Sequence, residues 1–232
     1  PHEFPYIVSL QYLNDQVKHF CGGSILSEKW VLTAGHCVDN YNNDSVVVAG
    51  AHSISNPDEF EQRRTPLRII IHEGYGGTVK PHDLALIEVS EPFVFNKNVN
   101  SIPLTTKDHE YPSGQVTMSG WGLTITENTT GYTTPDKLMK LNFPILDAKT
   151  CHTNFTEPGM HETNFCAGKL EDSKSACMGD SGGPLVQKNS KGKLELLGIT
   201  SWTWTPCGTI GKTTVFTNLS HYLKWISEKM NS

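Results

Sequence analysis

A serine lies between glycines near the end of the chain, in the stretch Gly179-Asp180-Ser181-Gly182-Gly183-Pro184. A histidine occurs in Thr33-Ala34-Gly35-His36-Cys37, and an aspartate begins Asp83-Leu84-Ala85-Leu86-Ile87. A hydroxyl nucleophile, an imidazole base and a carboxylate that orients the base are the minimum for serine-based acyl transfer. Taken singly, each residue is more typical of a turn, a cap or a structural histidine, so only the combination favours this chemistry.

The composition excludes several classes of protein. The 232 residues are 37% hydrophobic and 19% charged, with 20 glycines and 13 prolines, which indicates a globular, turn-rich chain. The formal net charge is -5, and no basic run indicates a nucleic-acid partner. No apolar stretch approaches the roughly 18 residues of a membrane span, and no signal peptide is recognisable. We therefore expect a globular protein, one or two domains in size, with no nucleic-acid partner and no membrane association.

Short apolar runs separated by turn residues must position the three chemical groups. Their regular spacing is typical of an all-β barrel or sandwich. Apolar residues at helical spacing predict one terminal α-helix over 219–230, capped by Asn218, and the polar stretch 128–135 predicts a loop. The clearest predicted strands cover residues 6–12, 23–26, 30–33, 46–50, 67–71, 84–89, 115–119, 138–143, 183–186, 195–199 and 214–216.

The cysteines and the glycosylation sequons indicate an oxidising environment. Six cysteines allow fifteen pairings, of which sequence order suggests three local ones. No Cys-x-x-Cys spacing favours a zinc cage or a thioredoxin-type motif. Cysteines and sequons together favour a secreted, extracellular glycoprotein. The suggested disulfides are Cys21–Cys37, Cys151–Cys166 and Cys177–Cys207, and the candidate glycosylation sites are Asn43, Asn128, Asn154 and Asn218.

The three motifs, in this order, resemble those of the chymotrypsin-like serine proteases. Ser119-Gly120-Trp121-Gly122 and Ser201-Trp202 fall in the expected gaps, so the resemblance covers essentially the whole chain. It implies two six-stranded antiparallel β-barrels with the active site in the cleft between them. The first barrel is expected in residues 1–97, and the second, followed by the terminal helix, in residues 98–232.

The resemblance also implies a role for each motif residue. Ser181 would be the nucleophile, His36 the general base and acid, and Asp83 the group that orients the imidazole. The backbone amides of Gly179 and Ser181 would form the oxyanion hole. Asp180 would act as an activation latch by pairing with the ammonium group of a new N-terminus. The printed chain starts Pro1-His2-Glu3 and lacks the family's Ile-Val-Gly-Gly, so a zymogen-like form is an alternative to a competent one.

Specificity is expected from the pocket that receives the side chain before the cut. Ser175 stands at the position that carries an aspartate in trypsin-like relatives, and a neutral serine does not offset the desolvation of a buried cation. Thr203 and Thr214 replace wall glycines, which predicts a shallow, elastase-like pocket for small or medium apolar side chains. A chymotrypsin-like preference for Leu, Phe or Tyr is the alternative. The predicted pocket residues are Ser175, Ala176, Met178, Thr200, Ser201, Trp202, Thr203 and Thr214.

Further expectations concern ligands and partners. Glu61 matches one calcium ligand of some relatives, but Ala51 occupies the other ligand position, so we predict no metal and no cofactor. The nine histidines besides His36 are expected to be surface groups. The expected partners are protein or peptide substrates, an activating protease and protein protease inhibitors, with the chain itself monomeric. A non-catalytic protease homologue that only binds partners is the alternative function.

Overall fold

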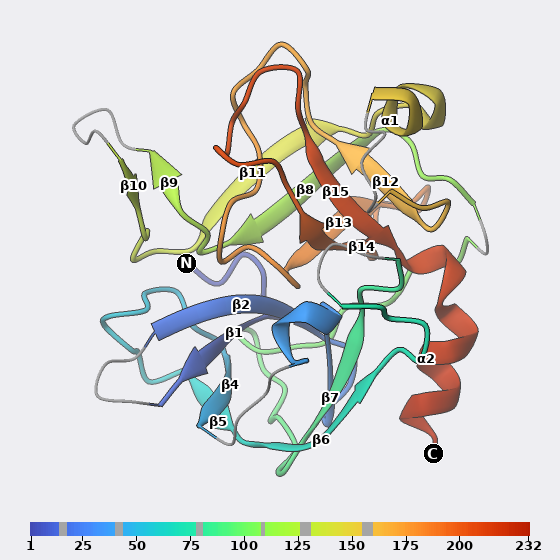
Figure 1. Ribbon diagram of the computed structural model, residues 1–232. Helices are drawn as coiled ribbons and strands as arrows, with labels where there is room; N and C mark the ends of the chain where they lie inside the picture. The colour runs from blue at the N-terminus through green and yellow to red at the C-terminus, as the bar shows by residue number, and fades with distance from the viewer. Residues whose placement is uncertain (14–17, 40–43, 78–80, 108–109, 126–130, 155–159) are drawn as a thin grey trace.

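Two curled antiparallel β-sheets make up most of the molecule (Figure 1). The computed structural model describes residues 1–13, 18–39, 44–77, 81–107, 110–125, 131–154 and 160–232. In Figure 1 the first sheet lies below the second, and the C-terminal helix starts near the junction of the two and runs down beside the first. The all-β class with two barrel-like halves and one C-terminal helix is confirmed.

The first sheet closes on itself because its two edge strands are neighbours in sequence. The strand order is β5-β4-β1-β2-β3-β7-β6, and only Thr65 separates the edges β5 and β6. The sheet has seven strands where six were expected, because the stretch 62–71 is interrupted at Thr65 and forms two strands. Pro66 begins the second of these strands, cannot donate a hydrogen bond to the ladder, and is followed by a register shift. The strands are β1 (Ile7–Tyr12), β2 (Lys18–Ile25), β3 (Trp30–Thr33), β4 (Ser45–Ala49), β5 (Gln62–Arg64), β6 (Pro66–Ile71) and β7 (Ala85–Val89).

The second sheet has six strands in the order β11-β8-β13-β14-β15-β12. Its edges meet through an antiparallel bridge between Ile145 and Ala167, next to a 2.9 Å hydrogen bond from Gly168 N to Pro144 O. The strands are β8 (Gln115–Gly120), β11 (Met139–Pro144), β12 (Asn164–Ala167), β13 (Pro184–Lys188), β14 (Leu194–Trp202) and β15 (Thr214–Asn218).

A separate two-stranded hairpin joins β9 (Thr124–Ile125) to β10 (Tyr132–Thr133). It overlaps the stretch 128–135 that the sequence predicts as a loop, so that prediction is wrong for Tyr132 and Thr133. Residues 128–130 of the same stretch lie outside the described residues.

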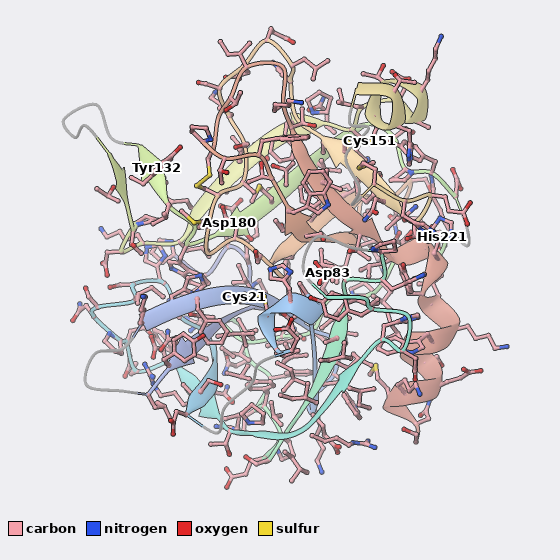
Figure 2. The ribbon with its side chains drawn as sticks, viewed as in Figure 1. Cys21, Asp83, Tyr132, Cys151, Asp180 and His221 are labelled. Atoms are coloured by element: carbon pink, nitrogen blue, oxygen red, sulfur yellow. A yellow bond between two sulfur atoms is a disulfide. The ribbon has the colours of Figure 1, made fainter. Side chains whose placement is uncertain are left out.

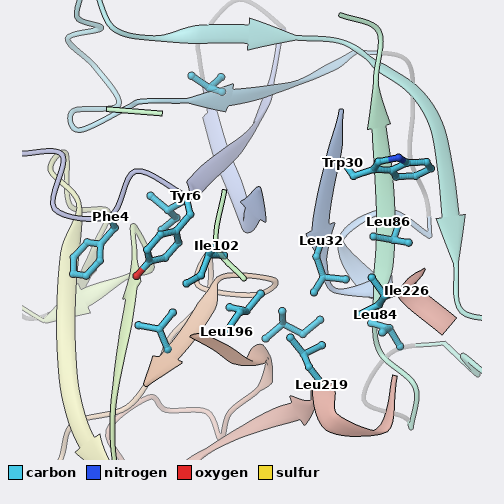
Figure 3. Packing of buried hydrophobic residues seen from close by; sticks show 14 of the residues in the cluster. Phe4, Tyr6, Trp30, Leu32, Leu84, Leu86, Ile102, Leu196, Leu219 and Ile226 are labelled. Atoms are coloured by element: carbon cyan, nitrogen blue, oxygen red, sulfur yellow. The ribbon is translucent and has the colours of Figure 1, made fainter. Parts of the chain in front are cut away.

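Apolar side chains fill each sheet and also the space between the two sheets. Val8, Val31 and Ile87 belong to the interior of the first sheet, and Phe165 and Phe216 to that of the second. A third cluster draws from both halves, and Figure 3 shows Leu32, Leu84, Leu196 and Leu219 among its members. Because this shared core contributes buried apolar area from both sheets, the two halves are held in one relative position.

The helices are short, and one of them differs from its predicted form. The region 219–230 contains a 3-10 turn, η2 (Leu219–His221), followed by α2 (Leu223–Met230), instead of one continuous α-helix. The Asn218 side chain caps the turn by accepting a 3.2 Å hydrogen bond from Ser220 N. Among the described residues, no helix is long and apolar enough to cross a membrane.

The chain forms a further helix that the sequence patterns did not predict, α1 (Ala148–Asn154). Asp147 precedes it, and its Oδ1 accepts a 2.9 Å hydrogen bond from Thr150 N. This is the contact of an N-cap residue with the third residue of a helix.

Candidate active site

Strand pairing in the first sheet brings His36 next to Asp83. β3 and β7 are antiparallel with Thr33 opposite Ala85, so the residues after β3 lie beside those before β7. A 3-10 turn, η1 (Gly35–Cys37), then places the His36 ring over the carboxylate. His36 Nδ1 is 2.8 Å from Asp83 Oδ2, and His36 N donates to Asp83 Oδ1 at 3.0 Å. Both carboxylate oxygens therefore fix the orientation of the His36 residue.

The surroundings of His36 favour its protonated form. Burial alone would lower the pKa of His36, but the hydrogen bond and charge of Asp83, with the charge of Asp39, raise it above its ordinary value. An imidazole held in this way is suited to accept a proton and to be stabilised as an imidazolium.

Asp83 is also held from the second sheet. Ser201, in β14, donates its hydroxyl to Asp83 Oδ2 at 2.6 Å, and Thr217, in β15, donates to Asp83 O at 3.1 Å. The Asp83 residue is only 1% exposed, so the bonds from Ser201 and His36 replace the water that its carboxylate requires, while Thr217 satisfies the backbone carbonyl. The sequence-based prediction assigned Ser201 to the substrate pocket and missed this contact with Asp83, which is labelled in Figure 2.

The Ser181 loop is fixed by backbone hydrogen bonds from both sheets. Gly22 N donates to Ser181 O at 2.8 Å, and Gly182 N donates to Thr200 O at 2.8 Å. Ser181 and His36 line one cavity of about 400 Å³. No hydrogen bond joins these two side chains in the described part of the chain, which is common before a substrate binds.

The amides of Gly179 and Ser181 donate to no acceptor among the described residues. Gly179 has φ of 100°, a conformation that glycine adopts without strain. His19 holds this turn, because its Nε2 is 2.8 Å from Gly179 O and its Nδ1 is 2.7 Å from Ser9 Oγ. Burial lowers the pKa of His19 to about 4, so its ring is neutral at pH 7.

His19 was expected at the surface, and that expectation is wrong, since the residue is only 8% exposed. The contact that holds its ring spans 160 residues, from β2 to the Gly179 carbonyl. We find no local sequence signal that would have indicated this role.

Asp180 points away from Ser181 and into the second sheet. Its Oδ1 accepts from Gly122 N and its Oδ2 from Cys177 N, both at 2.9 Å. Burial raises the pKa of Asp180 to about 6, although the two amide hydrogen bonds oppose the rise. A Cβ atom at Gly120 or Gly122 would collide with this carboxylate, which explains the glycines of the Ser-Gly-Trp-Gly stretch.

A second cavity of about 390 Å³ reaches Asp180 from the other side. Its walls include the apolar side chains of Met118, Leu123 and Leu141. Lys140 and Lys174 also line this cavity, so the carboxylate belongs to a space with mixed apolar and polar walls and room for a small chain segment.

Six of the eight predicted pocket residues line the cavity that contains Ser181, namely Ala176, Met178, Thr200, Ser201, Trp202 and Thr203.

The other two predicted residues, Thr214 and Ser175, do not line this cavity. Thr214 is fully buried, and its Oγ1 accepts from Ala176 N at 2.8 Å. Ser175 lines neighbouring cavities, and its Oγ donates to Ala176 O and accepts from Gly208 N. Ser175 and Thr214 thus lie outside the cavity that contains Ser181, and their part in the substrate pocket stays a prediction. The sequence-based prediction also missed Asp39 and Thr205, which line the Ser181 cavity.

The structure contains the three suggested disulfides, Cys21–Cys37, Cys151–Cys166 and Cys177–Cys207. The first pins the turn that carries His36. Among the described residues, one close set of candidate metal ligands is Cys21, His36 and Cys37, but both sulfurs are in a disulfide and offer no thiolate.

Of the sequons, Asn43 and Asn128 lie outside the described residues, as does the side chain of Asn154. Asn218 is only 2% exposed, and its Nδ2 donates to Glu110 O at 3.1 Å. A glycan would replace that buried hydrogen bond, so Asn218 does not remain a glycosylation candidate in the folded chain.

The family model for trypsin matches residues 1–226. Trypsin-1 of Astacus astacus is 37% identical over 230 residues, covering 97% of this chain and 94% of the relative. Trypsin-4 of Rattus norvegicus is 37% identical over 230 residues, covering 99% and 86%. Coagulation factor IX of Cavia porcellus is 36% identical over 234 residues, covering 97% and 77%. With this fold and this arrangement of His36, Asp83 and Ser181, the chain belongs to the trypsin family and is a chymotrypsin-like serine endopeptidase.

Proposed function

We propose that the chain cleaves peptide bonds through an acyl-enzyme on Ser181, with a preference for small or medium apolar side chains before the cut. The observation that carries the proposal is the His36–Asp83 pair, 2.8 Å apart, in the same cavity as Ser181. In acyl transfer by such a triad, the serine attacks, the histidine carries the proton and the aspartate orients the histidine. The His36–Asp83 contact assigns the last two roles, and Ser181 is the serine in the same cavity.

Ser181 Oγ attacks the peptide carbonyl while its proton passes to His36 Nε2. Asp83 accepts the Nδ1 proton of the imidazole in a hydrogen bond, which fixes the tautomer and stabilises the imidazolium that forms. His36 then gives its proton to the leaving amine, so the peptide bond breaks and the acyl group remains on Ser181. Water attacks the ester with His36 again as base, which releases the acid and restores the serine.

The oxyanion that develops in both steps is bound by the amides of Gly179 and Ser181. Neither amide has another acceptor among the described residues, so both are available to a developing negative charge. The loss of one such donor typically reduces the rate by about 100- to 1,000-fold. The bond from His19 to Gly179 O keeps this turn in place, which supports a competent form over the zymogen-like alternative.

We expect Thr203 and Thr214 to keep the pocket shallow. Thr203 lines the Ser181 cavity, and the buried Thr214 accepts a hydrogen bond from Ala176 N, in the wall of that cavity. A long cationic side chain finds no carboxylate at Ser175, whereas Ala or Val would fill the space near Thr200 and Thr203.

Asp180 is proposed as the activation latch. Its carboxylate is buried beside a cavity and has backbone amides as partners, and no ion pair joins it to a cation among the described residues. The ammonium group of a chain end entering this cavity would neutralise the buried charge and bind Asp180. An activating protease would create such an end, and the disulfides fit action outside the cell. Protein substrates and protein inhibitors are the proposed partners.

A panel of chromogenic peptides that differ only in the residue before the cut tests the proposal. We expect the highest kcat/KM for Ala or Val, and loss of all turnover in Ser181→Ala but not in the matched surface variant Ser190→Ala. Preferential cleavage after Arg or Lys would overturn the proposed pocket. A strong preference for Phe over Ala would support the chymotrypsin-like alternative instead.

A further inference from the structure

Four of the ten histidines line one cavity outside the active site. His72, His82, His161 and His221 surround a space of about 490 Å³, together with Tyr222 and Trp225. His72 and His82 lie in the connection between β6 and β7, His161 precedes β12, and His221 belongs to η2. The cavity therefore lies where three separate parts of the chain meet. Figure 2 labels His221 at the right of the view, near the start of the C-terminal helix. The proposed catalysis uses none of these rings.

Three of the rings have one nitrogen bound by the protein and one left over. His72 Nδ1 accepts from Gly74 N at 3.0 Å, His82 Nδ1 is 3.0 Å from the Tyr222 hydroxyl, and His161 Nδ1 is 2.9 Å from Thr163 Oγ1. No described residue bonds to the Nε2 atoms of these rings. A metal-binding imidazole is oriented when its other ring nitrogen donates a hydrogen bond, and the hydroxyl partners of His82 and His161 allow this, whereas His72 Nδ1 accepts from Gly74 N.

The spacing of His82 and His161 suits one shared cation. Their ring centroids are 5.4 Å apart, with planes inclined by 58°. Two imidazoles that bind one tetrahedral Zn²⁺ through Nε2, at about 2.0–2.1 Å each, place their centroids about 5 Å apart. The hydroxyl partners of both Nδ1 atoms can accept a proton as well as donate one, so each ring can take the tautomer that leaves the Nε2 lone pair free. In His161 this tautomer gives up the 3.3 Å hydrogen bond that Thr163 N donates to Nδ1.

His72 is placed to join this pair after a rotation of its ring. It stacks on His82 with centroids 4.9 Å apart and planes inclined by 13°, so its Nε2 does not yet converge with that of His82. If Nε2 binds the metal, the proton of the neutral ring moves to Nδ1. The exposed hydrogen bond that Gly74 N donates to Nδ1 is then lost and a metal bond is gained. Glu162, which is exposed and lines the same cavity, offers a carboxylate as a fourth ligand.

Glu73, the nearest carboxylate to His72 in sequence, is already engaged by Lys229 and Trp225 and does not join the site.

We propose that His82 and His161, joined by His72, bind a divalent transition-metal ion of the Zn²⁺ class at this cavity. The incomplete calcium loop at Ala51 and Glu61 led to the prediction of no metal, and these histidines share no recognisable spacing motif. Only the fold brings residues 72, 82 and 161 together. Imidazole ligands favour Zn²⁺ or Cu²⁺ over Ca²⁺ and Mg²⁺, which prefer oxygen ligands.

Isothermal titration of Zn²⁺ into the untagged, EDTA-treated and dialysed full chain tests the proposal. We expect one saturable equivalent, not displaced by Ca²⁺ or Mg²⁺, and at least about tenfold weaker binding in His161→Gln. His82→Gln should weaken binding similarly. His152→Gln, a histidine on α1 away from the cavity, and His36→Gln, in the active site, should bind Zn²⁺ as the parent chain does.

Thermal unfolding gives an independent readout of the same site. Zn²⁺ should raise the Tm of the parent chain, because binding to the folded state joins segments that separate on unfolding, and it should not raise the Tm of His161→Gln. The absence of saturable Zn²⁺ binding would overturn the proposal. Binding that survives both His82→Gln and His161→Gln, or that is lost in His36→Gln alone, would overturn it as well.

Discussion

Opening the substrate pocket should convert a preference for small residues into one for aromatic residues. The double substitution Thr203→Gly and Thr214→Gly removes the two side chains that narrow the space behind Ser181. Thr214 is fully buried and bonded to Ala176 N, which belongs to the wall of the Ser181 cavity, so we expect its loss to enlarge that cavity toward Ser175. A Phe side chain before the cut would then be buried in the enlarged pocket.

The size of the effect follows from the area of the ring. Full burial of a Phe side chain contributes about 1.5–3 kcal/mol relative to leaving it exposed. Since about 1.4 kcal/mol is a factor of ten, the ratio of kcat/KM for Phe over Ala should rise roughly 10- to 150-fold. The same change removes the acceptor of Ala176 N, which should lower the free energy of unfolding by about 1–3 kcal/mol.

The assay is a pair of chromogenic peptides that differ only in Phe or Ala before the cut. Thr203→Gly alone keeps the Ala176 hydrogen bond and serves as a second variant if the double variant is unstable. Thr209→Gly, at an exposed threonine of the same region, is the matched control and should leave the ratio unchanged. A folded double variant that still cleaves the Ala peptide, without any rise for Phe, would refute the reasoning about the pocket.

Three further predictions concern charge and cross-linking. Catalysis needs neutral His36, so kcat/KM should fall as the pH drops through the raised pKa of His36, and Asp39→Asn should move this acid limb to lower pH in a pH–rate profile. The pKa of Asp180 is about 6 when folded and near 3.8 when unfolded, so the folded form binds more protons between these values. The free energy of unfolding should therefore decrease as the pH rises from about 4 to 6, and denaturant titrations should show a smaller decrease for Asp180→Asn. Replacing Cys21 and Cys37 by Ala opens a link across 16 residues and should cost about 3 kcal/mol of unfolding free energy, whereas an unchanged denaturation midpoint would argue against that value.

Much of the β-architecture could be predicted from local patterns. Runs such as Val46–Gly50 and Leu84–Val89 are apolar enough to indicate buried strands, and β4 and β7 are found there. β12 was missed because Asn164–Ala167 is only four residues long and begins with a polar side chain. The split of the terminal helix depends on the Asn218 cap, which favours a tight first turn, and periodicity alone did not indicate it.

The candidate site was only partly predictable, for a physical reason. The motifs indicated His36, Asp83 and Ser181, but not the groups that hold them. The bonds from Ser201 to Asp83 and from His19 to Gly179 join residues 118 and 160 positions apart, and no local pattern encodes such contacts. The hydrogen bond from Ala176 N to Thr214 Oγ1 next to Ser175 likewise joins residues 38 positions apart, and the sequence patterns did not indicate it.

Labelling with a fluorophosphonate probe tests the central claim, a serine activated by His36 and Asp83, most directly. The activated chain should take up one equivalent of probe at neutral pH, and peptide mass spectrometry should place it on Ser181. Labelling should be abolished in Ser181→Ala and strongly slowed in His36→Ala, while Ser190→Ala should label as the parent does. Absence of labelling in the activated chain, or an adduct on any other serine, would contradict the account.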